Sequence, residues 1–395
     1  MADNWPEVYL KEIAKPVHRS VPVEAGTSYR TIGVKWWGMG AYERETIDGS
    51  RTSAKTLSIV RKGDLIINKI WVRHGSVAVA TQDVDGCTGS GEFPTFELDL
   101  NRIEPRWIYW QTKMKSFWGK CDSLSRGTSG KNRIKPELFL TIKIPLPPLD
   151  EQRRIVARIE ALAARISEAQ CLRQEAVEEA KVLLELKIGE VFAHITDTTK
   201  PLSILASKIG SGSTPKGGRA SYPTSGIPFI RSMNVRMRKF QWDDIVFIDT
   251  ETHLSMIGTK VKPNDVLLNI TGASIGRVAC APTNLPEANV NQHVAIIRPV
   301  KELEPRFLMY WLSQPSIQSF INNEQKGATR QGLTKSQIEK LEIPIPQLDE
   351  QQRIVDYLDG LHVQVDSICR LQAETQKELD ALLPSIMDRA FKGEL

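Results

Sequence analysis

The chain repeats one sequence element at half its length. IPLPPLDEQRRIV occupies residues 144–156 and IPIPQLDEQQRIV occupies residues 343–355, a shift of 199 residues in a chain of 395. Ten of the thirteen positions are identical. The similarity continues upstream, where GDLIIN at 63–68 parallels NDVLLN at 264–269. A repeat on this scale indicates two copies of one structural unit rather than a single large core.

The repeated element separates globular sequence from helical sequence in both halves. Before it, short runs rich in Val and Ile are bounded by Gly, Pro and Asn, which is typical of strands. After it, apolar residues recur with helical spacing. The globular parts carry a positive net charge and the helical parts a negative one. We therefore predict mixed α/β domains at 1–149 and 199–348, a central helical spacer at 150–198 and a C-terminal helical region at 349–395.

Several elements of the globular parts can be predicted directly. Pro lies near the start of two apolar segments, 105–118 and 305–321, and favours a helix in each. Pro315 is expected to interrupt the second helix. The predicted strands are DLIIN at 64–68, SVAVA at 76–80, DVLLN at 265–269 and VAIIRPV at 294–300.

Each helical part carries an apolar heptad pattern, and the two patterns are displaced by 199 residues. Asp150 and Asp349 are expected to cap the two helices, and Pro384 to kink or end the second near Leu383. A helix over about 151–193 would be about 64 Å long, so its apolar stripe needs a partner, and the other copy is the simplest one. The predicted pairing residues are Ile155, Ile159, Leu162, Ile166 and Arg173, and Leu358, Leu361, Val365, Ile368 and Gln372, with Leu183 and Leu382 further along the two patterns.

Arg173 and Gln372 hold the same position in the two patterns. We expect them to approach one another and to set the register of helix pairing. The alternative is that the aliphatic part of the Arg173 side chain packs against the helix pair and its guanidinium extends to solvent. The first helix is also the only covalent link between the two globular parts, so its length is expected to fix the distance between them.

Sequence signatures of catalysis and metal binding are absent. There is no HExxH or GxSxG motif, and the glycine-rich SGSTPKGG at 211–218 lacks the GK[ST] of a phosphate-binding loop. The five cysteines form no CxxC pair, and the six histidines show no ligand spacing. We expect no catalysis and no metal. Without a signal peptide or a run of about 18 apolar residues, the chain is expected to be cytoplasmic and to have no membrane partner.

Basic and hydrogen-bonding side chains cluster at corresponding places in both halves, ahead of the repeated element. The clusters are SRGTSGKNRIK at 125–135, RSMNVRMRKF at 231–240 and QKGATRQGLTK at 325–335. Arg and Lys neutralise phosphates, and Arg, Asn and Gln can read base edges, so the clusters favour binding of double-stranded DNA. The predicted DNA-binding residues are Lys69, Arg73, Arg126, Thr128, Ser129, Lys131 and Arg133 in the first half, and Lys216, Arg231, Asn234, Arg236, Arg238, Lys326, Arg330, Gln331 and Lys335 in the second.

The duplicated DEQ element with its heptad helix resembles the specificity subunit of Type I restriction-modification systems. The resemblance covers essentially the whole chain and includes GDLIINKIWVRHGSVAVA, SGSTPKGG and the closing FKGEL. It implies an α+β fold with two similar mixed α/β target recognition domains, separated by two long antiparallel coiled-coil-like helices, with an internal pseudo-twofold repeat.

The resemblance also implies a function and partners. Each domain would read one half of a bipartite, asymmetric DNA target, and the helices would set the gap between the halves. The partners would be two modification subunits, which methylate adenine with S-adenosylmethionine, and motor-nuclease restriction subunits that use ATP. This chain itself would bind no cofactor. The two domains differ at YRTIGVKWWGMGAYERE (29–45) and SYPTSGIPFIRSMNV (221–235), so their half-sites should differ.

Two other functions remain open from the sequence. A single-chain restriction enzyme uses similar modules, but 395 residues leave no room for its methyltransferase and nuclease domains. A helical adaptor could use the basic domains to bind acidic proteins instead of DNA. The salt dependence of binding to duplex DNA distinguishes a DNA-binding protein from a protein-binding adaptor. Contacts to phosphates release counterions, so the affinity for DNA falls steeply as the salt concentration rises.

Overall fold

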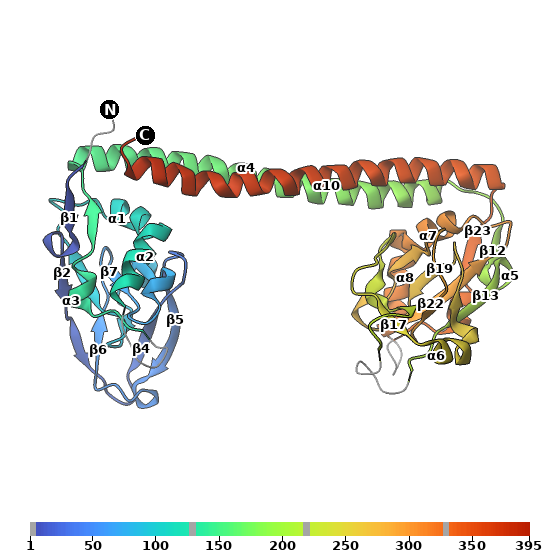
Figure 1. Ribbon diagram of the computed structural model, residues 1–395, viewed down its shortest axis with the longest axis horizontal. Helices are drawn as coiled ribbons and strands as arrows, with labels where there is room; N and C mark the ends of the chain where they lie inside the picture. The colour runs from blue at the N-terminus through green and yellow to red at the C-terminus, as the bar shows by residue number, and fades with distance from the viewer. Residues whose placement is uncertain (1–4, 126–131, 216–221, 327–331) are drawn as a thin grey trace. The chain divides into compact units, whose positions relative to one another are not determined.

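The computed structural model describes residues 5–125, 132–215, 222–326 and 332–395 (Figure 1). The chain divides into two compact units. Unit 1 consists of Met1–Arg173 with Ala373–Leu395, and unit 2 is the continuous segment Gln174–Gln372. This division cuts through both long helices, whereas the predicted boundaries separate the helices from the domains.

The α/β domain of unit 1 contains two large sheets. Its elements are β1 (Glu7–Tyr9), β2 (Ala14–Val17), β3 (Ser20–Pro22), β4 (Ser28–Val34), β5 (Ala41–Asp48), β6 (Thr56–Ile59), β7 (Leu65–Ile67), β8 (Val77–Val79), β9 (Thr88–Gly89), β10 (Thr95–Leu98), α1 (Pro105–Gln111), α2 (Lys115–Leu124), α3 (Pro136–Phe139) and β11 (Lys143–Pro145). The four-stranded sheet has the order β2-β10-β7-β8 and the five-stranded sheet the order β3-β6-β9-β4-β5. Trp107, Phe96 and Phe139 are fully buried in the core between helices and sheet.

The α/β domain of unit 2 contains two four-stranded sheets. Its elements are β12 (Thr199–Pro201), α5 (Leu202–Leu205), β13 (Ala206–Ser211), β14 (Ile227–Ile230), β15 (Val235–Arg236), β16 (Lys239–Phe240), β17 (Val246–Ile248), α6 (Thr250–Ser255), β18 (Lys260–Val261), β19 (Val266–Asn269), β20 (Val278–Cys280), β21 (Ala288–Val290), β22 (Val294–Pro299), α7 (Pro305–Ser313), α8 (Pro315–Lys326), α9 (Lys335–Glu339) and β23 (Glu342–Pro344). The sheet orders are β13-β22-β19-β20 and β17-β14-β21-β18.

The two domains share the strand pairings that the sequence repeat predicts. Ile66 of β7 pairs with Ala78 of β8, and 201 positions further on Leu267 of β19 pairs with Ala279 of β20. In both units, the strand that contains the repeated Ile-Pro dipeptide, β11 or β23, pairs antiparallel with the first strand of its own domain. The predicted α+β class with two similar domains is confirmed.

One sequence prediction in these domains is wrong. The segment 105–118 forms two helices, α1 and α2, instead of one. The hydroxyl of Thr112 donates to the carbonyl of Tyr109, and the carbonyl of Thr112 accepts from the indole of Trp118, so the connection is closed by its own hydrogen bonds. In unit 2, Pro315 separates α7 from α8 as predicted.

The two long helices are α4 (Leu149–Ala193) and α10 (Leu348–Phe391), and they run antiparallel within each unit. In unit 1, Ile155 near the start of α4 shares a core with Phe391 at the end of α10. Further along, the Gln170 amide donates to the Asp380 carboxylate at 2.9 Å. In unit 2, Ile188 of α4 shares a core with Leu358 near the start of α10. The predicted antiparallel arrangement is therefore confirmed.

The starts of the long helices differ from the prediction. Both begin at the residue before the predicted cap, at Leu149 and Leu348, so Asp150 and Asp349 lie inside the first turn and do not cap it. There they still favour the helix, because carboxylates near a helix N-terminus interact with its positive dipole end. The structural role of the repeated element belongs instead to the glutamine two residues further along each helix.

Gln152 is fully buried and joins α4 to the α/β domain. Its Oε1 accepts from the main-chain N–H of Glu104 at 2.9 Å, and its Nε2 donates to the carbonyls of Arg102 at 3.0 Å and Pro147 at 2.7 Å. Gln351 makes the same three bonds in unit 2, with Glu304, Glu302 and Pro346. The repeated DEQ element therefore encodes a junction between helix and domain. We call Gln152 and Gln351 the junction glutamines.

The heptad pattern follows the buried side of the helices only over part of their length. Ile155, Ile159 and Leu358 are fully buried, whereas Leu162, Ile166, Leu361 and Val365 are partly buried. Leu183, Leu382 and Ile368 are 54%, 45% and 38% exposed, so the prediction fails at these positions. After Ala180 the buried side passes to Leu184, Ile188 and Phe192, which are spaced by four residues. The reason is geometric: a nearly straight helix with 3.6 residues per turn drifts off a seven-residue pattern.

The second helix does not end at Pro384, so of the two predicted effects, a kink or an end, the end is wrong. The helix continues to Phe391. Its last two turns bury Met387, Ala390 and Phe391 in the core of unit 1, where Phe391 packs edge-on against Trp107 at 4.7 Å between ring centroids. This packing offsets the hydrogen bond that Pro384 cannot donate.

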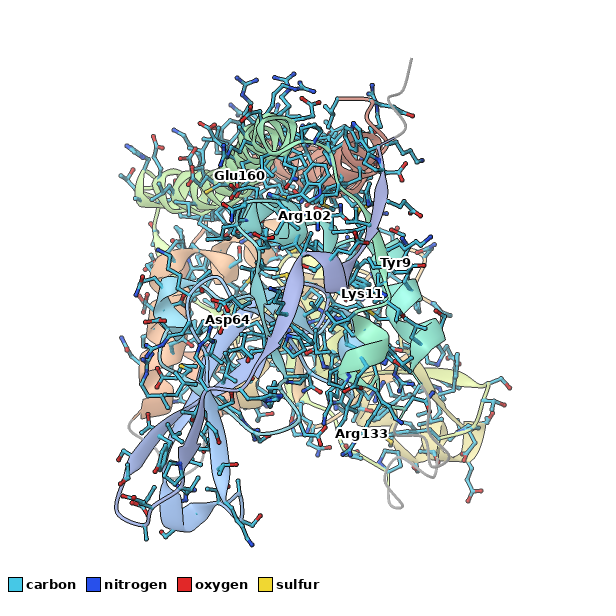
Figure 2. The ribbon with its side chains drawn as sticks, turned by 90° about the vertical axis from the view of Figure 1, so that its left-hand side faces the viewer. Tyr9, Lys11, Asp64, Arg102, Arg133 and Glu160 are labelled. Carbon is cyan, nitrogen blue, oxygen red and sulfur yellow. The ribbon has the colours of Figure 1, made fainter. Side chains whose placement is uncertain are left out.

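A buried aspartate precedes the central strand of each domain. Asp64, labelled in Figure 2, is 3% exposed and pairs with Arg19 at 2.5 Å. Its counterpart Asp265 is 1% exposed and pairs with Arg298 at 2.7 Å. Arg19 follows β2, whereas Arg298 belongs to β22, so the two domains supply the same ion pair from different elements.

Candidate nucleic-acid interface

In unit 1, two segments that are distant in sequence meet beside β7. The connection from β7 to β8 carries Lys69 and Arg73, and the carbonyl of Lys69 accepts from the N–H of Ile134 at 3.0 Å. Arg133 consequently lies beside this connection and pairs with Glu92 at 3.3 Å. The Arg133 side chain is 52% exposed, and in Figure 2 it lies far from Glu160 of α4. The predicted residues of unit 1 that the structure describes are thus brought together.

Unit 2 repeats this arrangement with different side chains. The carbonyl of Ile270 accepts from the N–H of Leu333 at 2.9 Å, and Thr271 forms a β-bridge with Gly332. The connection from β19 to β20 therefore meets the segment that leads into α9. Lys335, the first residue of α9, is 63% exposed and lies 3.5 Å from Glu339. An exposed pair of this kind is weak, which leaves the ammonium available to a phosphate.

The segment Arg231–Arg236 meets the same connection in unit 2. The Asn269 amide donates to the carbonyl of Ser232 at 2.9 Å. Arg231 donates to the carbonyl of Asp244 at 2.6 Å, and exposed Arg236 donates to Gln241 at 2.9 Å. Neither guanidinium is held by a carboxylate among the residues that the structure describes. Both side chains fit the predicted role.

Asn234 does not fit that role, and the prediction for it is wrong. Its side chain is fully buried. Its Oδ1 accepts from the N–H of Arg231 at 3.0 Å, and its Nδ2 donates to the carbonyls of Gln241 at 3.1 Å and Asp243 at 3.0 Å. The amide holds the turn that presents Arg231 and Arg236, and it has no exposed edge to offer to a base.

Arg238 is also misassigned by the sequence. Its side chain is only 8% exposed and binds both oxygens of Glu185 on α4, at 2.5 and 3.2 Å. Nearby, the Tyr310 hydroxyl donates to Asp359 of α10 at 2.7 Å. Burial, with this hydrogen bond, raises the pKa of Tyr310, and burial lowers the pKa of His362 one turn further along α10. Arg238 therefore attaches the domain of unit 2 to the helices.

We expect Arg238→Ala to lower the free energy of unfolding by about 2 kcal/mol, because it removes two charge-assisted hydrogen bonds from a mostly buried site. Chemical denaturation of the full chain measures this change. Arg236→Ala is the matched control, since Arg236 is exposed and its replacement should alter stability by less than about 0.5 kcal/mol. Equal stability of Arg238→Ala and the parent would contradict the attachment role.

The remaining predicted residues lie outside the described part of the chain. Lys326 ends α8, but its side chain is not described. The others are Arg126, Thr128, Ser129, Lys131, Lys216, Arg330 and Gln331. Their assignments stay predictions, as does the pairing of Arg173 with Gln372.

The sequence reasoning missed an aromatic surface in unit 1. Trp36, Trp37 and Trp71 are 44%, 55% and 37% exposed and pack around His74, with Trp118 of α2 against Trp37. We call these five residues the tryptophan cluster. The WW pair was visible in the sequence, but nothing in the pattern showed that residues 36, 71 and 118 would meet.

A chain of polar side chains in unit 2 was missed as well. His293 Nδ1 lies 2.5 Å from Thr271 Oγ1, Gln292 Nε2 lies 3.3 Å from His293 Nε2, and the Thr214 hydroxyl donates to Gln292. Gln292 is exposed. A glutamine amide at such an edge can bind adenine through two hydrogen bonds, so these residues belong to the candidate interface.

The described residues hold no group of three or more His, Cys, Asp or Glu side chains that could bind a metal ion. In the same part of the chain, none of the helices has the length and apolar content needed to cross a membrane.

Comparison with known proteins identifies the class of these domains. A family model described as the Type I restriction modification DNA specificity domain matches residues 2–178 and 206–379. These ranges include most of the chain, which therefore belongs to the family of Type I restriction modification DNA specificity domains. The resemblance to this family that the sequence indicated is confirmed.

Individual relatives agree with this assignment. The chain is 26% identical over 277 residues to the specificity subunit of the Type I restriction enzyme EcoBI of Escherichia coli; the match covers 64% of this chain but only 58% of that relative's length. The HsdS subunit from Thermoanaerobacter tengcongensis is 27% identical with a TM-score of 0.64, covering 100% of this chain and 98% of that one. A chain solved in work on complex assembly and conformational transition of the type I R-M system is 27% identical with a TM-score of 0.76, covering 100% and 99%.

Proposed function

We propose that each α/β domain binds one half of a bipartite DNA target as part of a Type I restriction-modification complex. The observation that carries the proposal is the repeated convergence of two segments beside the central strand of each domain. In unit 1 these are the β7–β8 connection and residues 132–135, and in unit 2 the β19–β20 connection and residues 332–335. The framework is the same in both units, but the exposed side chains differ, which is what reading two different half-sites requires.

The long helices supply the second part of the proposal, the spacing of the half-sites and the docking of modification subunits. Apolar side chains on α4 and α10 remain exposed outside the helix pair, including Leu172 at 59%, Leu186 at 62% and Val363 at 68%. Exposed apolar residues of this size on a helix surface favour a protein partner. Motor-nuclease subunits would complete the complex, and catalysis with S-adenosylmethionine and ATP would belong to the partner subunits.

A salt titration tests DNA binding itself. The affinity of the full chain with its modification subunits for duplex DNA should fall steeply between about 50 and 200 mM salt, because several phosphates are neutralised. Arg133→Ala should reduce the slope of log affinity against log salt by about 1. Arg153→Ala is the matched control. Like Arg133, Arg153 is an exposed arginine, at 58%, with a carboxylate partner, Asp150, but it lies on α4 and not in the candidate interface, so its replacement should not change the slope. A flat salt dependence of the parent would favour the protein-binding adaptor instead.

Sequencing of methylated DNA tests the assignment of one domain to one half-site. Cells that produce the chain with its modification partner should carry a bipartite methylated motif. The double variant Arg236→Ala, Lys335→Ala should relax or weaken only the half read by unit 2, at about 1–3 kcal/mol for each base-reading side chain that is removed. Equal changes in both halves of the motif would contradict the assignment.

A further inference from the structure

The tryptophan cluster of unit 1 is a rigid apolar surface beside the candidate interface. The ring centroids of Trp36 and Trp71 are 4.9 Å apart, and those of Trp36 and His74 are 5.6 Å apart. Trp71 and His74 belong to the β7–β8 connection that also carries Lys69 and Arg73. The cluster is therefore built on one of the two segments that form the candidate interface.

Main-chain contacts fix the cluster in place. The N–H of Trp37 donates to the carbonyl of His74, and the N–H of Gly38 to that of Gly75, both at 2.8 Å. Gly75 has a φ of 76°, and a Cβ at this position would lie 2.6 Å from the indole of Trp118. Glycine is thus required where the two connections touch. The backbone that carries Trp37 and His74 is therefore fixed by hydrogen bonds within the domain.

Trp37 adopts a backbone conformation that a large side chain rarely takes. Its φ is 59°, in the left-handed region, although its indole is 55% exposed. Such a conformation costs on the order of 1 kcal/mol for a non-glycine residue. The indole packs against Trp36, His74 and Trp118, yet more than half of it stays exposed to solvent. Strained, exposed residues of this kind are concentrated at binding sites.

The charges around the cluster match a polyanion. Lys35 precedes Trp36, and Lys69 and Arg73 flank Trp71. In the described part of the chain, none of these three cations forms an ion pair with a carboxylate. An apolar surface bordered by unneutralised cations complements DNA better than it complements an apolar or basic protein surface.

We propose that the tryptophan cluster contacts thymine methyl groups in the major groove of the half-site bound by unit 1. The inference rests on the proposed function. Trp36 lies against both Trp71 and His74, at 4.9 and 5.6 Å between ring centroids with 38° and 32° between the ring planes, so these rings partly cover one another and leave less free face for a stacked base. The thymine methyl is the apolar group that the major groove offers. Unit 2 has Gly272 and Ile275 at the positions of Trp71 and His74, so it lacks an equivalent cluster, and the proposed contact belongs to the half-site of unit 1.

The test combines a protein variant with a DNA variant. Duplexes carry the methylated motif of this system, and uracil replaces each thymine of the unit 1 half-site in turn. For the full chain with its modification subunits, at least one replacement should weaken binding about fourfold, the effect of one buried methyl group. With Trp37→Asn or Trp36→Ser, the same replacement should have no further effect. Replacements in the unit 2 half-site should affect the parent and the tryptophan variants equally.

Trp37→Asn separates binding from folding. Asparagine tolerates the left-handed conformation, so the variant should fold, and its melting temperature should fall by no more than the loss of one half-exposed indole implies. Affinity should fall about tenfold while the salt slope stays constant, because every phosphate contact is retained. Leu100→Asn is the matched control: Leu100 is 63% exposed in the turn after β10, and its replacement should not alter binding.

Two results would overturn the proposal: a Trp37→Asn variant that binds as tightly as the parent, or uracil replacements that weaken variant and parent equally. Either result leaves DNA recognition by unit 1 intact. A parent complex that binds no DNA would instead refute the proposed function.

Discussion

Inserting one heptad into each long helix at the boundary between the units should widen the methylated motif without changing its half-sites. The insertion points are Arg173/Gln174 in α4 and Gln372/Ala373 in α10, where the chain passes from one unit to the other. Each helix gains about 10.5 Å, which corresponds to up to about 3 base pairs at about 3.4 Å each. Sequencing of methylated DNA reads out the new gap directly.

The structure explains why both helices need the insertion. In the sequence, α4 is the only covalent link between the two α/β domains. The structure adds a second connection, because Met387 and Phe391 at the end of α10 are buried in the core of unit 1. A heptad placed in α4 alone, for example between Leu162 and Ala163, would pull this core away from α10, and we expect an inactive protein.

The expected activity and the controls follow from helix and duplex geometry. A heptad rotates a helix by only about 20° from its starting direction, whereas three base pairs rotate the duplex by about 100°, so methylation should be slower than in the parent. A paired insertion of two residues rotates the helix by about 200° and should abolish helix pairing. An active seven-residue variant that still marks the original gap would show that the helices do not set the spacing.

Replacing a junction glutamine should destabilise its unit strongly. Gln152→Leu retains the volume but leaves the N–H of Glu104 and the carbonyls of Arg102 and Pro147 without their partner. Each buried group left unpaired costs about 1–3 kcal/mol, so we expect the free energy of unfolding to fall by about 3 kcal/mol or more. Thermal unfolding of the full chain should show a midpoint lowered by roughly 6 °C or more.

The second copy of the junction provides an internal comparison. Gln351→Leu should have an effect of the same size, because Gln351 makes the equivalent three bonds. Gln352→Leu, one residue further along α10, is the control: Gln352 is exposed, and within the described residues its side chain bonds only to Asp356 of the same helix. If Gln152→Leu and Gln352→Leu unfold at the same temperature, the junction is not a source of stability.

The features that the sequence predicts well depend on local pattern or on repetition. The repeated element located both long helices, and Pro315 correctly separated α7 from α8. The side chains that face the core along the whole of a 45-residue helix could not be predicted in this way. Leu183 and Leu184 are the same residue type, and the seven-residue pattern selects Leu183, whereas Leu184 is the buried one.

The sequence predicted which types of residue form the candidate site, but not which of them are exposed and which hold the domain to the helices. Arg236 and Arg238 stand two positions apart in one basic cluster, yet Arg236 is exposed and Arg238 binds Glu185, 53 residues earlier in the chain. The tryptophan cluster joins three segments, and its assembly depends on the positive φ angles of Trp37 and Gly75. Long-range contacts and unusual backbone conformations leave no periodic signal in the sequence.

The division of unit 1 into two chain segments sets the order in which the protein is completed during synthesis. Unit 2 is continuous and can close as soon as Gln372 has left the ribosome, whereas unit 1 awaits residues 373–395, which are made after everything else in either unit. At about 5–20 residues per second, the first domain waits about 10–40 s for the helix end that fills its core. A chain that ends before Phe391 therefore lacks side chains that α10 adds to the core of unit 1, and its first domain is left with an incomplete core.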